Sequence, residues 1–412
     1  MSLTFLENLD PQRMDEFVIQ SDQNTLFQCS EWAKVKNNWD AYFTGVEKDG
    51  VLSATALVLA RKLPLGKTLF YIPRGPVMDY RDIDLVRFFL DQLVALAKKK
   101  HAICLRFDPN ILSRKYPYKE KDQKHVYENN DIIETLKQYG AKHKGFTTMI
   151  EEATQPRYNA VMNCCDDYYE KLDHKTKQSI HTAERKGAKL YCGHEYIHEF
   201  AQAMQYTEKR KGVALRNEEY FKNMAEVYGD RCIIMVAKLN FKEQIDEIDR
   251  DLKEARTQLE SCTSKKQINL LKQRIQNDEK DRDILIGEYE KEGRDEVILA
   301  GKLAIYNENR MEFVYMGNNA DYLRIRSSYL LYKTYLDICV EKGIRFVSMG
   351  GIEGTLDDGL TKFKSSWLMD VEEYIGEFNI VLDPFVYKLF DDVYPHLLQT
   401  AAKLRNRKKV TD

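Results

Sequence analysis

Two apolar segments, Arg231-Cys-Ile-Ile-Met-Val-Ala-Lys-Leu239 and Val297-Ile-Leu-Ala-Gly-Lys-Leu-Ala-Ile-Tyr306, enclose a charged insertion and decide the fold. Both segments are rich in aliphatic and β-branched residues, which predicts two strands. Between them, residues 240–295 change to the spacing of a helix. The sequence therefore predicts a β-meander in which one hairpin carries a helical arm.

The insertion is predicted to be an antiparallel pair of helices. Its apolar residues recur in steps of three and four, which is heptad spacing. The first helix would place Ile245, Ile248, Leu252, Ala255, Leu259 and Cys262 on the seam, and the second Ile268, Leu271, Ile275, Asp278, Arg282, Leu285 and Tyr289. Helices of about 24 residues each would give an arm of roughly 35 Å. Such an arm indicates a large partner, with a dimerisation or spacer role as the alternative.

The same order of elements is predicted twice along the chain. The first copy has strands at 42–47, 51–62 and 67–72, an amphipathic helix at 83–100 and a strand at 102–107. The second copy has strands at 231–239, 297–306 and 311–316, a helix at 322–342 and a strand at 344–349. A tight turn at Asp49-Gly50 in the first copy corresponds to the arm in the second, and hairpin tips tolerate insertion. The fold class is therefore α/β (α+β), with a doubled β-β-β-α-β order that resembles the GNAT acyltransferase fold.

Composition excludes several functional classes. The 412 residues carry 63 basic and 65 acidic side chains, so the chain is not a general polyelectrolyte and any contact with nucleic acid must be local. The longest apolar run, Val51 to Ala60, is too short to span a bilayer, and the N-terminus lacks the pattern of a signal peptide. Eight cysteines without a CxxC pair indicate reduced thiols and a cytoplasmic location.

Neither a metal nor a cofactor is expected. His194-Glu-Tyr-Ile-His198 matches the HExxH pattern of zinc hydrolases. However, a strand is predicted to end at Gly193, so His194 would cap the helix instead of lying within it. The pyrophosphate-binding loop of acetyl-CoA-dependent GNAT enzymes is also missing before both predicted helices, where the second copy has Met316-Gly-Asn-Asn-Ala320.

Six motifs in order resemble one family, the Fem family of aminoacyl-tRNA-dependent peptidoglycan ligases, over essentially the whole chain. They are Trp32-Ala-Lys-Val-Lys36, Tyr71-Ile-Pro-Arg-Gly-Pro-Val77, Arg106-Phe-Asp-Pro109, the basic segment from Lys175 to Gly187, the segment from Thr207 to Phe221, and Gly350-Gly-Ile-Glu-Gly354 followed by Gly359-Leu-Thr-Lys-Phe-Lys364. With the arm included, the chain is most similar to the streptococcal branched-muropeptide enzymes, which add serine or alanine.

The resemblance implies an aminoacyltransferase whose donor is aminoacyl-tRNA and whose acceptor is lipid II or another muropeptide precursor. The enzyme would have two GNAT-like domains, residues 1–153 with 376–412 and residues 154–375, the second carrying the arm at 240–295. It would work in the cytoplasm, with peripheral contact at the inner face of the membrane left open, as is the oligomeric state. The alternatives are transfer to a protein N-terminus and a non-catalytic binding module that uses the arm.

The resemblance also implies roles for individual residues. Lys36, Arg216 and Tyr220 match positions that bind the diphosphate of the acceptor, although each also fits an ordinary helix surface. Lys364, with Lys362 behind it, matches a lysine near the transferred acyl group, whose charge would stabilise the oxyanion. The same lysines also fit the end of an amphipathic helix.

Two more residues at strand ends are candidates for the same site. Arg74 would line the acceptor pocket or else hold the ends of strands together. Asp108 would take the proton of the attacking amine or bind the acceptor ammonium, with a plain Asp-Pro turn as the alternative.

A basic stripe is the candidate surface for tRNA. Lys175, Lys177, Arg185 and Lys186 lie on one predicted helix, and lysine and arginine in such a row can follow RNA phosphates. A solvated helix face is the alternative. The short basic segment from Lys403 to Lys409 could likewise contact anionic lipid or RNA.

Overall fold

The computed structural model describes residues 2–212 and 216–390, so the basic segment 403–409 lies outside the described residues. The chain forms two compact units. Unit 1 consists of Met1–Asn163 with Ser348–Asp412, and unit 2 consists of Cys164–Val347. These limits differ from 153/154 and 375/376, and the division at those positions into functional domains stays a prediction.

Unit 1 contains the first copy of the predicted pattern. Strands β2 (Asp40–Lys48), β3 (Val51–Lys62) and β4 (Thr68–Ile72) form the meander, and α3 (Ile83–Lys99) leads into β6 (Ala102–Phe107), which runs parallel to β4. The sheet has the order β1-β2-β3-β4-β6-β16-β8, with β5 on β3. The additional strands are β1 (Leu3–Leu6), β5 (Val77–Met78), β8 (Lys142–His143) and β16 (Phe378–Val381). Together these strands confirm the predicted β-β-β-α-β order.

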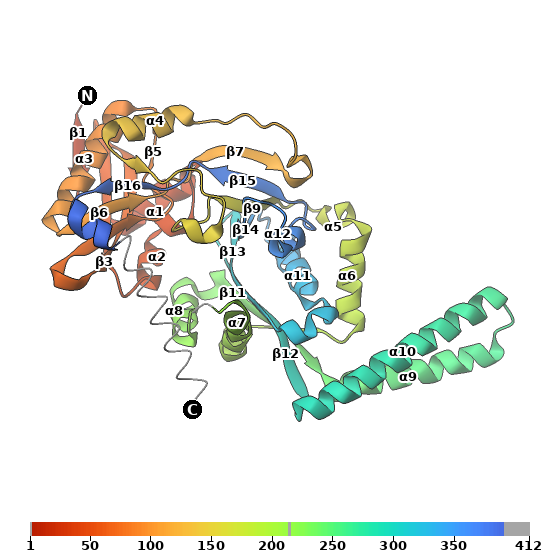
Figure 1. Ribbon diagram of the computed structural model, residues 1–412. Coiled ribbons are helices and arrows are strands. Elements are labelled where there is room, and N and C mark those ends of the chain that lie inside the picture. Colours follow the sequence, from red (N-terminus) through yellow and green to blue (C-terminus); the bar gives the residue numbers. More distant parts are fainter. Residues whose placement is uncertain (1, 213–215, 391–412) are drawn as a thin grey trace. The chain divides into compact units, whose positions relative to one another are not determined.

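Helix α3 covers this sheet with its apolar face (Figure 1). Phe89 of α3 and Phe70, Phe107 and Phe378 of the strands are fully buried in one core. Helices α1 (Pro11–Gln20), α2 (Ser30–Val35) and α4 (Asn130–Tyr139) complete this part of the unit. The core fixes the carboxyl ends of β4 and β6 side by side, which positions the site described below.

Unit 1 also contains a second group of strands. β14 (Phe346–Ile352), β9 (Tyr158–Asn163), β15 (Asp370–Tyr374) and β7 (Leu112–Pro117) lie in this order, and β15 is antiparallel to both β9 and β7. β14 begins in the last residues of unit 2 and is followed by a glycine-rich loop and by α12 (Gly359–Lys364).

Unit 2 contains the second copy. β10 (Lys189–Cys192), β11 (Cys232–Asn240), β12 (Glu296–Tyr306) and β13 (Arg310–Asn318) form an antiparallel meander. Around it lie α5 (Tyr168–Lys171), α6 (His174–Arg185), α7 (Ile197–Lys211), α8 (Glu218–Tyr228) and α11 (Ser327–Glu341). The helix predicted from Tyr322 starts only at Ser327, because Ala320–Ile325 is a 3₁₀ turn and Arg326 is left-handed at φ 64°.

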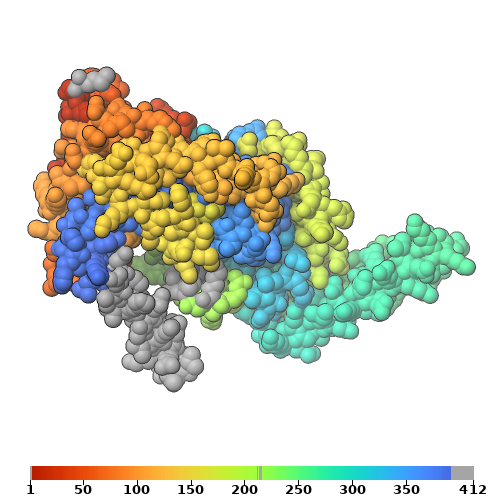
Figure 2. Space-filling view, turned by 45° about the horizontal axis from the view of Figure 1, so that its top comes forward, coloured from red at the N-terminus to blue at the C-terminus, as the bar shows by residue number. Residues whose placement is uncertain are grey.

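The insertion between β11 and β12 is a helical hairpin, as predicted. Its helices are α9 (Phe241–Ser261) and α10 (Lys265–Glu292), 21 and 28 residues long instead of about 24 each. Of the residues predicted for the seam, Ile248, Leu252, Ala255 and Leu285 are buried and the others are half-buried. Figure 2 shows the arm (blue-green) as a projection of unit 2. None of the helices in the described ranges has the length and apolar character that crossing a bilayer requires.

The HExxH segment is split between two elements, as expected. His194 lies in a 3₁₀ turn before α7, and its Nε2 is 2.8 Å from the carbonyl oxygen of Cys232. His198 lies in α7, and its Nδ1 is 2.9 Å from a carboxylate oxygen of Glu218. The two imidazoles therefore contact different groups.

Candidate functional site

The turn after β4 and the end of β6 form a buried polar cluster in unit 1. Because β4 and β6 are parallel neighbours, Arg74 and Asp108 emerge at the same edge of the sheet. The backbone N–H of Arg74 donates to Asp108 Oδ1 at 2.6 Å, and the hydroxyl of Tyr71 donates to Asp108 Oδ2 at 2.8 Å. Arg74 adopts φ 53°, a conformation that costs energy for a residue with a side chain. The turn thus aims a backbone donor at the carboxylate.

Burial changes the acidity of Asp108. The side chain is 2 % exposed, and this burial raises its pKa to about 7, against the opposing effects of the Arg74 charge and of the hydrogen bonds from Arg74 and Tyr71. Each carboxylate oxygen accepts one of these two hydrogen bonds and has a second lone pair. A carboxyl group that titrates near neutral pH can accept and release a proton during a reaction.

The side chain of Arg74 is buried and faces the protein interior. One guanidinium nitrogen, Nη2, donates to the carbonyl oxygen of Pro156 at 2.7 Å, and the group lies over the ring of Tyr374 at 4.1 Å. Arg74 therefore joins the turn after β4 to the segment before β9. This contact fits the alternative in which Arg74 holds the ends of strands together better than it fits a role in lining the acceptor pocket.

Lys364 organises the glycine-rich loop. It ends α12, whose N-cap Asp358 accepts hydrogen bonds from the backbone N–H groups of Leu360 and Thr361. The buried ammonium of Lys364 donates to the carbonyl oxygens of Gly350 at 3.1 Å and Gly351 at 2.8 Å. The Lys362 side chain of the same helix is exposed.

Gly351 connects Lys364 to the Asp108 cluster. A Cβ at position 351 would lie 2.4 Å from Pro156 Cγ, so only glycine allows the loop to pack on this proline. Asp108, Arg74, Pro156, Gly351 and Lys364 thus form one continuous series of contacts within unit 1. The two residues predicted to be catalytic, at positions 108 and 364, are its ends.

The sequence interpretation missed the ion pairs beside this series. Glu373 of β15 is fully buried between Arg157, at 2.5 Å, and Arg114. Arg157 also donates to the hydroxyl of Tyr158, on which Gly354 of the loop packs. The sequence feature that could have indicated these ion pairs is Glu372-Glu373. Successive side chains of a strand point to opposite faces, so one of the two glutamates must face inward.

The residues predicted to bind the acceptor diphosphate belong to both units. Lys36 of unit 1 is the C-cap that follows α2, and its ammonium lies 4.6 Å from the centre of the Trp32 ring. In unit 2, the Arg216 guanidinium lies 5.0 Å from the ring of Tyr220. Arg216 precedes α8, which begins at Glu218, so the expectation that the two residues share a helix turn is wrong. Burial and the neighbouring Tyr315 raise the pKa of Tyr220, so its hydroxyl stays protonated and can donate.

The basic stripe of α6 divides into two parts. Lys175 is exposed, and Lys177 donates to the carbonyl oxygen of Glu170 at 2.8 Å. Arg185 and Lys186, at the end of the helix, instead form ion pairs with the arm. Arg185 is 3.7 Å from Asp278 and 3.6 Å from Asp281, and Lys186 is 3.5 Å from Asp281.

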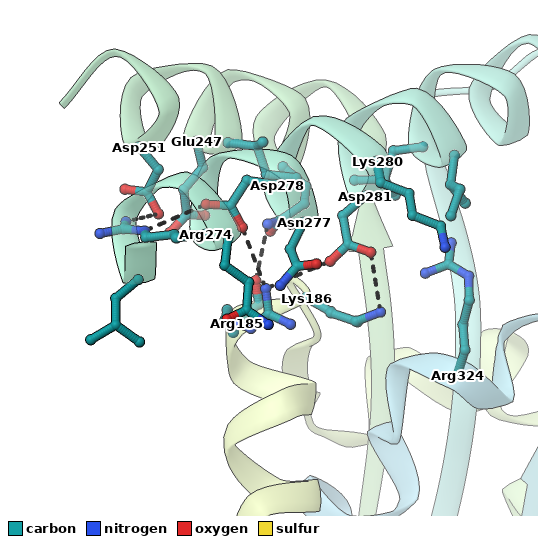
Figure 3. Close-up of a pocket in the computed structure, with 16 residues that line it drawn as sticks. Arg185, Lys186, Glu247, Asp251, Arg274, Asn277, Asp278, Lys280, Asp281 and Arg324 are labelled. Carbon is teal, nitrogen blue, oxygen red and sulfur yellow. Dashed lines mark hydrogen bonds and ion pairs between the residues drawn. The ribbon is translucent and has the colours of Figure 1, made fainter. Parts of the chain in front are cut away.

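A cleft of about 790 Å³ lies between the end of α6 and the base of the arm. Figure 3 shows Arg185 and Lys186 directed at Asp278 and Asp281 of α10. Arg274 lies on the other side of Asp278 at 3.4 Å. The predicted tRNA contacts of Arg185 and Lys186 would therefore replace ion pairs that already exist.

One group of side chains in the described ranges has the spacing of metal ligands. It consists of Asp15, Cys29 and Glu31. The Asp15 carboxylate, however, accepts from the backbone N–H of Ser30 at 2.7 Å and from its hydroxyl at 2.5 Å, which fixes the start of α2. Burial raises the pKa of Asp15, which weakens it further as a ligand.

Comparison with solved structures shows that the chain has a GNAT type of fold. The crystal structure of FemX superposes with a TM-score of 0.73 at 24% sequence identity, covering 95% of this chain and 100% of that chain. A tandem GNAT protein from the clavulanic acid biosynthesis pathway gives a TM-score of 0.53 at 8% identity, covering 92% and 98%. At these identities the two structures establish the fold, which agrees with the doubled pattern in the sequence.

Comparison of the sequence establishes the family. A lipid II:glycine glycyltransferase of Staphylococcus aureus (strain MRSA252) is 27% identical over 427 residues, which cover 97% of this chain and 98% of that protein. The same description applies to the similar protein of strain USA300, also 27% identical. The model of the FemAB family matches residues 9–394, nearly the whole sequence. The chain therefore belongs to the FemAB family.

Proposed function

We propose that the protein transfers an amino acid, alanine or serine, from aminoacyl-tRNA to the amine of the stem-peptide lysine, or of the first bridge residue, of lipid II. Family membership and the 27% identical lipid II:glycine glycyltransferase support the reaction class and the acceptor. The observation that carries the proposal is the buried Asp108, with a pKa of about 7, connected to Lys364 by the contacts of Arg74, Pro156 and Gly351.

The reaction is aminolysis of an ester, which proceeds without ATP. The acceptor nitrogen attacks the ester carbonyl carbon, the C–N bond forms, and the bond to the 3′ oxygen of the tRNA breaks. Asp108 takes the proton that the amine loses and returns it to the leaving oxygen. Lys364 holds the glycine-rich loop, and its positive charge stabilises the oxyanion. Holding the two substrates in line contributes up to roughly 10 kcal/mol.

The remaining predicted residues receive binding roles in the proposal. Lys36, Arg216 and Tyr220 would bind the acceptor diphosphate. The arm and the basic residues Lys175, Lys177, Arg185 and Lys186 would bind tRNA. The functional domains would be residues 1–153 with 376–412 and residues 154–375, and the protein would work at the inner face of the membrane without a cofactor.

Transfer of radiolabelled alanine or serine from charged tRNA to lipid II by the purified protein tests the proposal, with the UDP-linked pentapeptide as the comparison acceptor. Label on lipid II identifies the donor residue as well as the reaction. Transfer to a protein N-terminus instead, or binding of tRNA without transfer to any acceptor, would refute it in favour of the two alternatives.

A further inference from the structure

The connection between β3 and β4 carries a leucine at its tip that contacts almost nothing. Leu65 is 95% exposed and adopts φ 61°, a left-handed conformation that disfavours side chains. It stands in Arg61-Lys-Leu-Pro-Leu-Gly-Lys67, with basic residues on both sides. An exposed leucine in a strained conformation adds nothing to the folded core, so its role lies outside unit 1.

Two further exposed apolar side chains belong to the helical residues that the β3–β4 connection contacts. Residues 384–390 are helical, and within them Phe385 is 82% and Leu389 56% exposed. The Lys67 ammonium pairs with Asp383 at 2.8 Å, and Leu63 packs with residues from the other face of this helix in one small core. Figure 1 shows the β3–β4 connection (orange) and the helical residues 384–390 (dark blue) on the same side of unit 1.

We propose that Leu65, Phe385 and Leu389, together named the apolar tip, insert into the surface of an anionic lipid bilayer. Four basic residues lie within four positions of its three side chains in the sequence, namely Arg61, Lys62, Lys67 and Lys388. Asp40 lies 3.2 Å from the Lys62 ammonium, and Asp383 pairs with Lys67. Apolar side chains that enter the headgroup region, bordered by lysine and arginine, match the chemistry of an anionic membrane surface.

The small size of the apolar tip favours a bilayer over a protein partner. A stable protein interface buries about 800 Å² on each side, which three side chains on one loop and on the helical residues 384–390 cannot supply. Insertion into a membrane needs only a few apolar side chains together with basic residues. The binding to a bilayer is inferred from the residues themselves. Only its biological purpose rests on the proposed function, because an acceptor linked to lipid would lie at the membrane surface.

Another exposed apolar group in unit 1 has a different explanation. Tyr127 and Phe146 lie 6.2 Å apart, and the guanidinium groups of Arg114 and Arg157 lie over their rings at 4.4 and 5.2 Å. These two rings therefore cover the buried ion pairs with Glu373. Val126, 82% exposed beside them, supplies a matched control for an apolar side chain away from the apolar tip.

Sedimentation of the full chain with vesicles tests the inference without tRNA or muropeptide, so its outcome is independent of any transfer activity. We expect binding to vesicles of phosphatidylglycerol and phosphatidylcholine, and much weaker binding to phosphatidylcholine alone. The double variant Leu65→Ser, Phe385→Ser should bind at least roughly tenfold more weakly, whereas Val126→Ser should bind like the wild type. Lys62→Gln should cost roughly fivefold, an effect that high salt removes.

Insertion itself is measured with Leu65→Trp, whose added fluorescence should be quenched by brominated lipids. All changes are at exposed positions, and unchanged thermal melting confirms that the variants fold. Absence of binding to anionic vesicles, equal binding of the double variant and the wild type, or no quenching of the tryptophan would each overturn the inference. Self-association that the double variant abolishes, without vesicle binding, would identify the apolar tip as a contact between two copies instead.

Discussion

Arg74 donates a hydrogen bond from Nη2 to the carbonyl oxygen of Pro156, 82 residues further along the chain, at 2.7 Å. The same residue donates its backbone N–H to Asp108. One arginine thus fixes both the carboxyl group proposed as the base and the segment on which the glycine-rich loop packs.

Replacing Arg74 should therefore affect stability and transfer together. Arg74→Met leaves the Pro156 carbonyl without this donor in a buried place, and we expect a loss of roughly 2–3 kcal/mol in the free energy of unfolding. Arg74→Lys should not restore activity, because lysine lacks the planar group that donates while it stacks on Tyr374. Urea unfolding and the transfer rate measure the two effects.

Arg81 provides the matched control for this experiment. Its side chain is 62% exposed and pairs with Asp131 at the surface of the same unit. Arg81→Met should change the free energy of unfolding by less than about 1 kcal/mol. Equal destabilisation by the two changes would show that the Arg74 contact has no special importance.

Asp108 makes the stability of the protein depend on pH. Burial raises its pKa from the ordinary value of 3.8 to about 7 in the folded state. A raised carboxyl pKa contributes stability that is complete below about pH 4 and is lost as the pH rises through 7. Relative to Asp108→Asn, the wild type should lose roughly 3 kcal/mol between pH 5 and pH 8, measured by urea unfolding. A constant difference between the two proteins would contradict the raised pKa.

The same group should control the pH dependence of transfer. If the ionised Asp108 takes the amine proton, the rate rises with pH through an inflection near 7. Asp108→Asn retains an oxygen for the Arg74 N–H but cannot accept a proton, so we expect a rate at least roughly 100-fold lower, without the inflection. A variant that keeps the inflection would assign it to another group.

Lys364 and Lys362 form a natural pair of test positions on one short helix. Lys364→Met removes the donors to the carbonyl oxygens of Gly350 and Gly351, so we expect a loss of roughly 1–3 kcal/mol and a strong fall in transfer. Lys362 is exposed, so Lys362→Met should leave stability within about 0.5 kcal/mol. Any effect of the second change on the Michaelis constant would then report contact with a substrate.

Removing an acidic partner from the ion pairs at the base of the arm should increase the affinity for tRNA. Asp281→Asn removes the ion pair of Lys186, 3.5 Å away, and one of the two ion pairs of Arg185, 3.6 Å away, which leaves Arg185 with Asp278. Affinity for tRNA should rise severalfold, and the slope of log affinity against log salt should steepen by roughly one for each basic residue released. Glu279→Gln, which removes the pair with Arg256 within the arm, is the control. Unchanged binding by Asp281→Asn would remove Lys186 from the tRNA surface.

The arm and the doubled order of elements were predictable because their signals are periodic. A seam such as Ile248, Leu252 and Ala255 repeats in a way that survives without tertiary context. The predicted start of α11 was wrong by five residues, because nothing in the amino-acid composition indicates that Arg326 adopts a left-handed conformation. Local backbone conformation of this kind is set by packing.

The interior of the candidate site was only partly predictable. Asp108 and Lys364 were named from motifs, yet their connection passes through a proline carbonyl that no pattern marks. Likewise Glu373 is paired with Arg157 across 216 positions of sequence, and hydrophobic periodicity assigns such charges to the surface. Buried polar contacts depend on which strands become neighbours, and this information is not local.

The base of the arm has a mechanical consequence. The ladder between β11 and β12 continues up to the pair Asn240 and Glu296, and the N–H of Phe241 donates to the carbonyl oxygen of Asp295 at 2.8 Å. The sheet therefore closes as it would around a short turn. With 28 residues in α10, the arm is a lever roughly 40 Å long. A tilt of only a few degrees at that closure would carry its far end through several ångströms, so a small change among the side chains at the base becomes a large displacement at the tip.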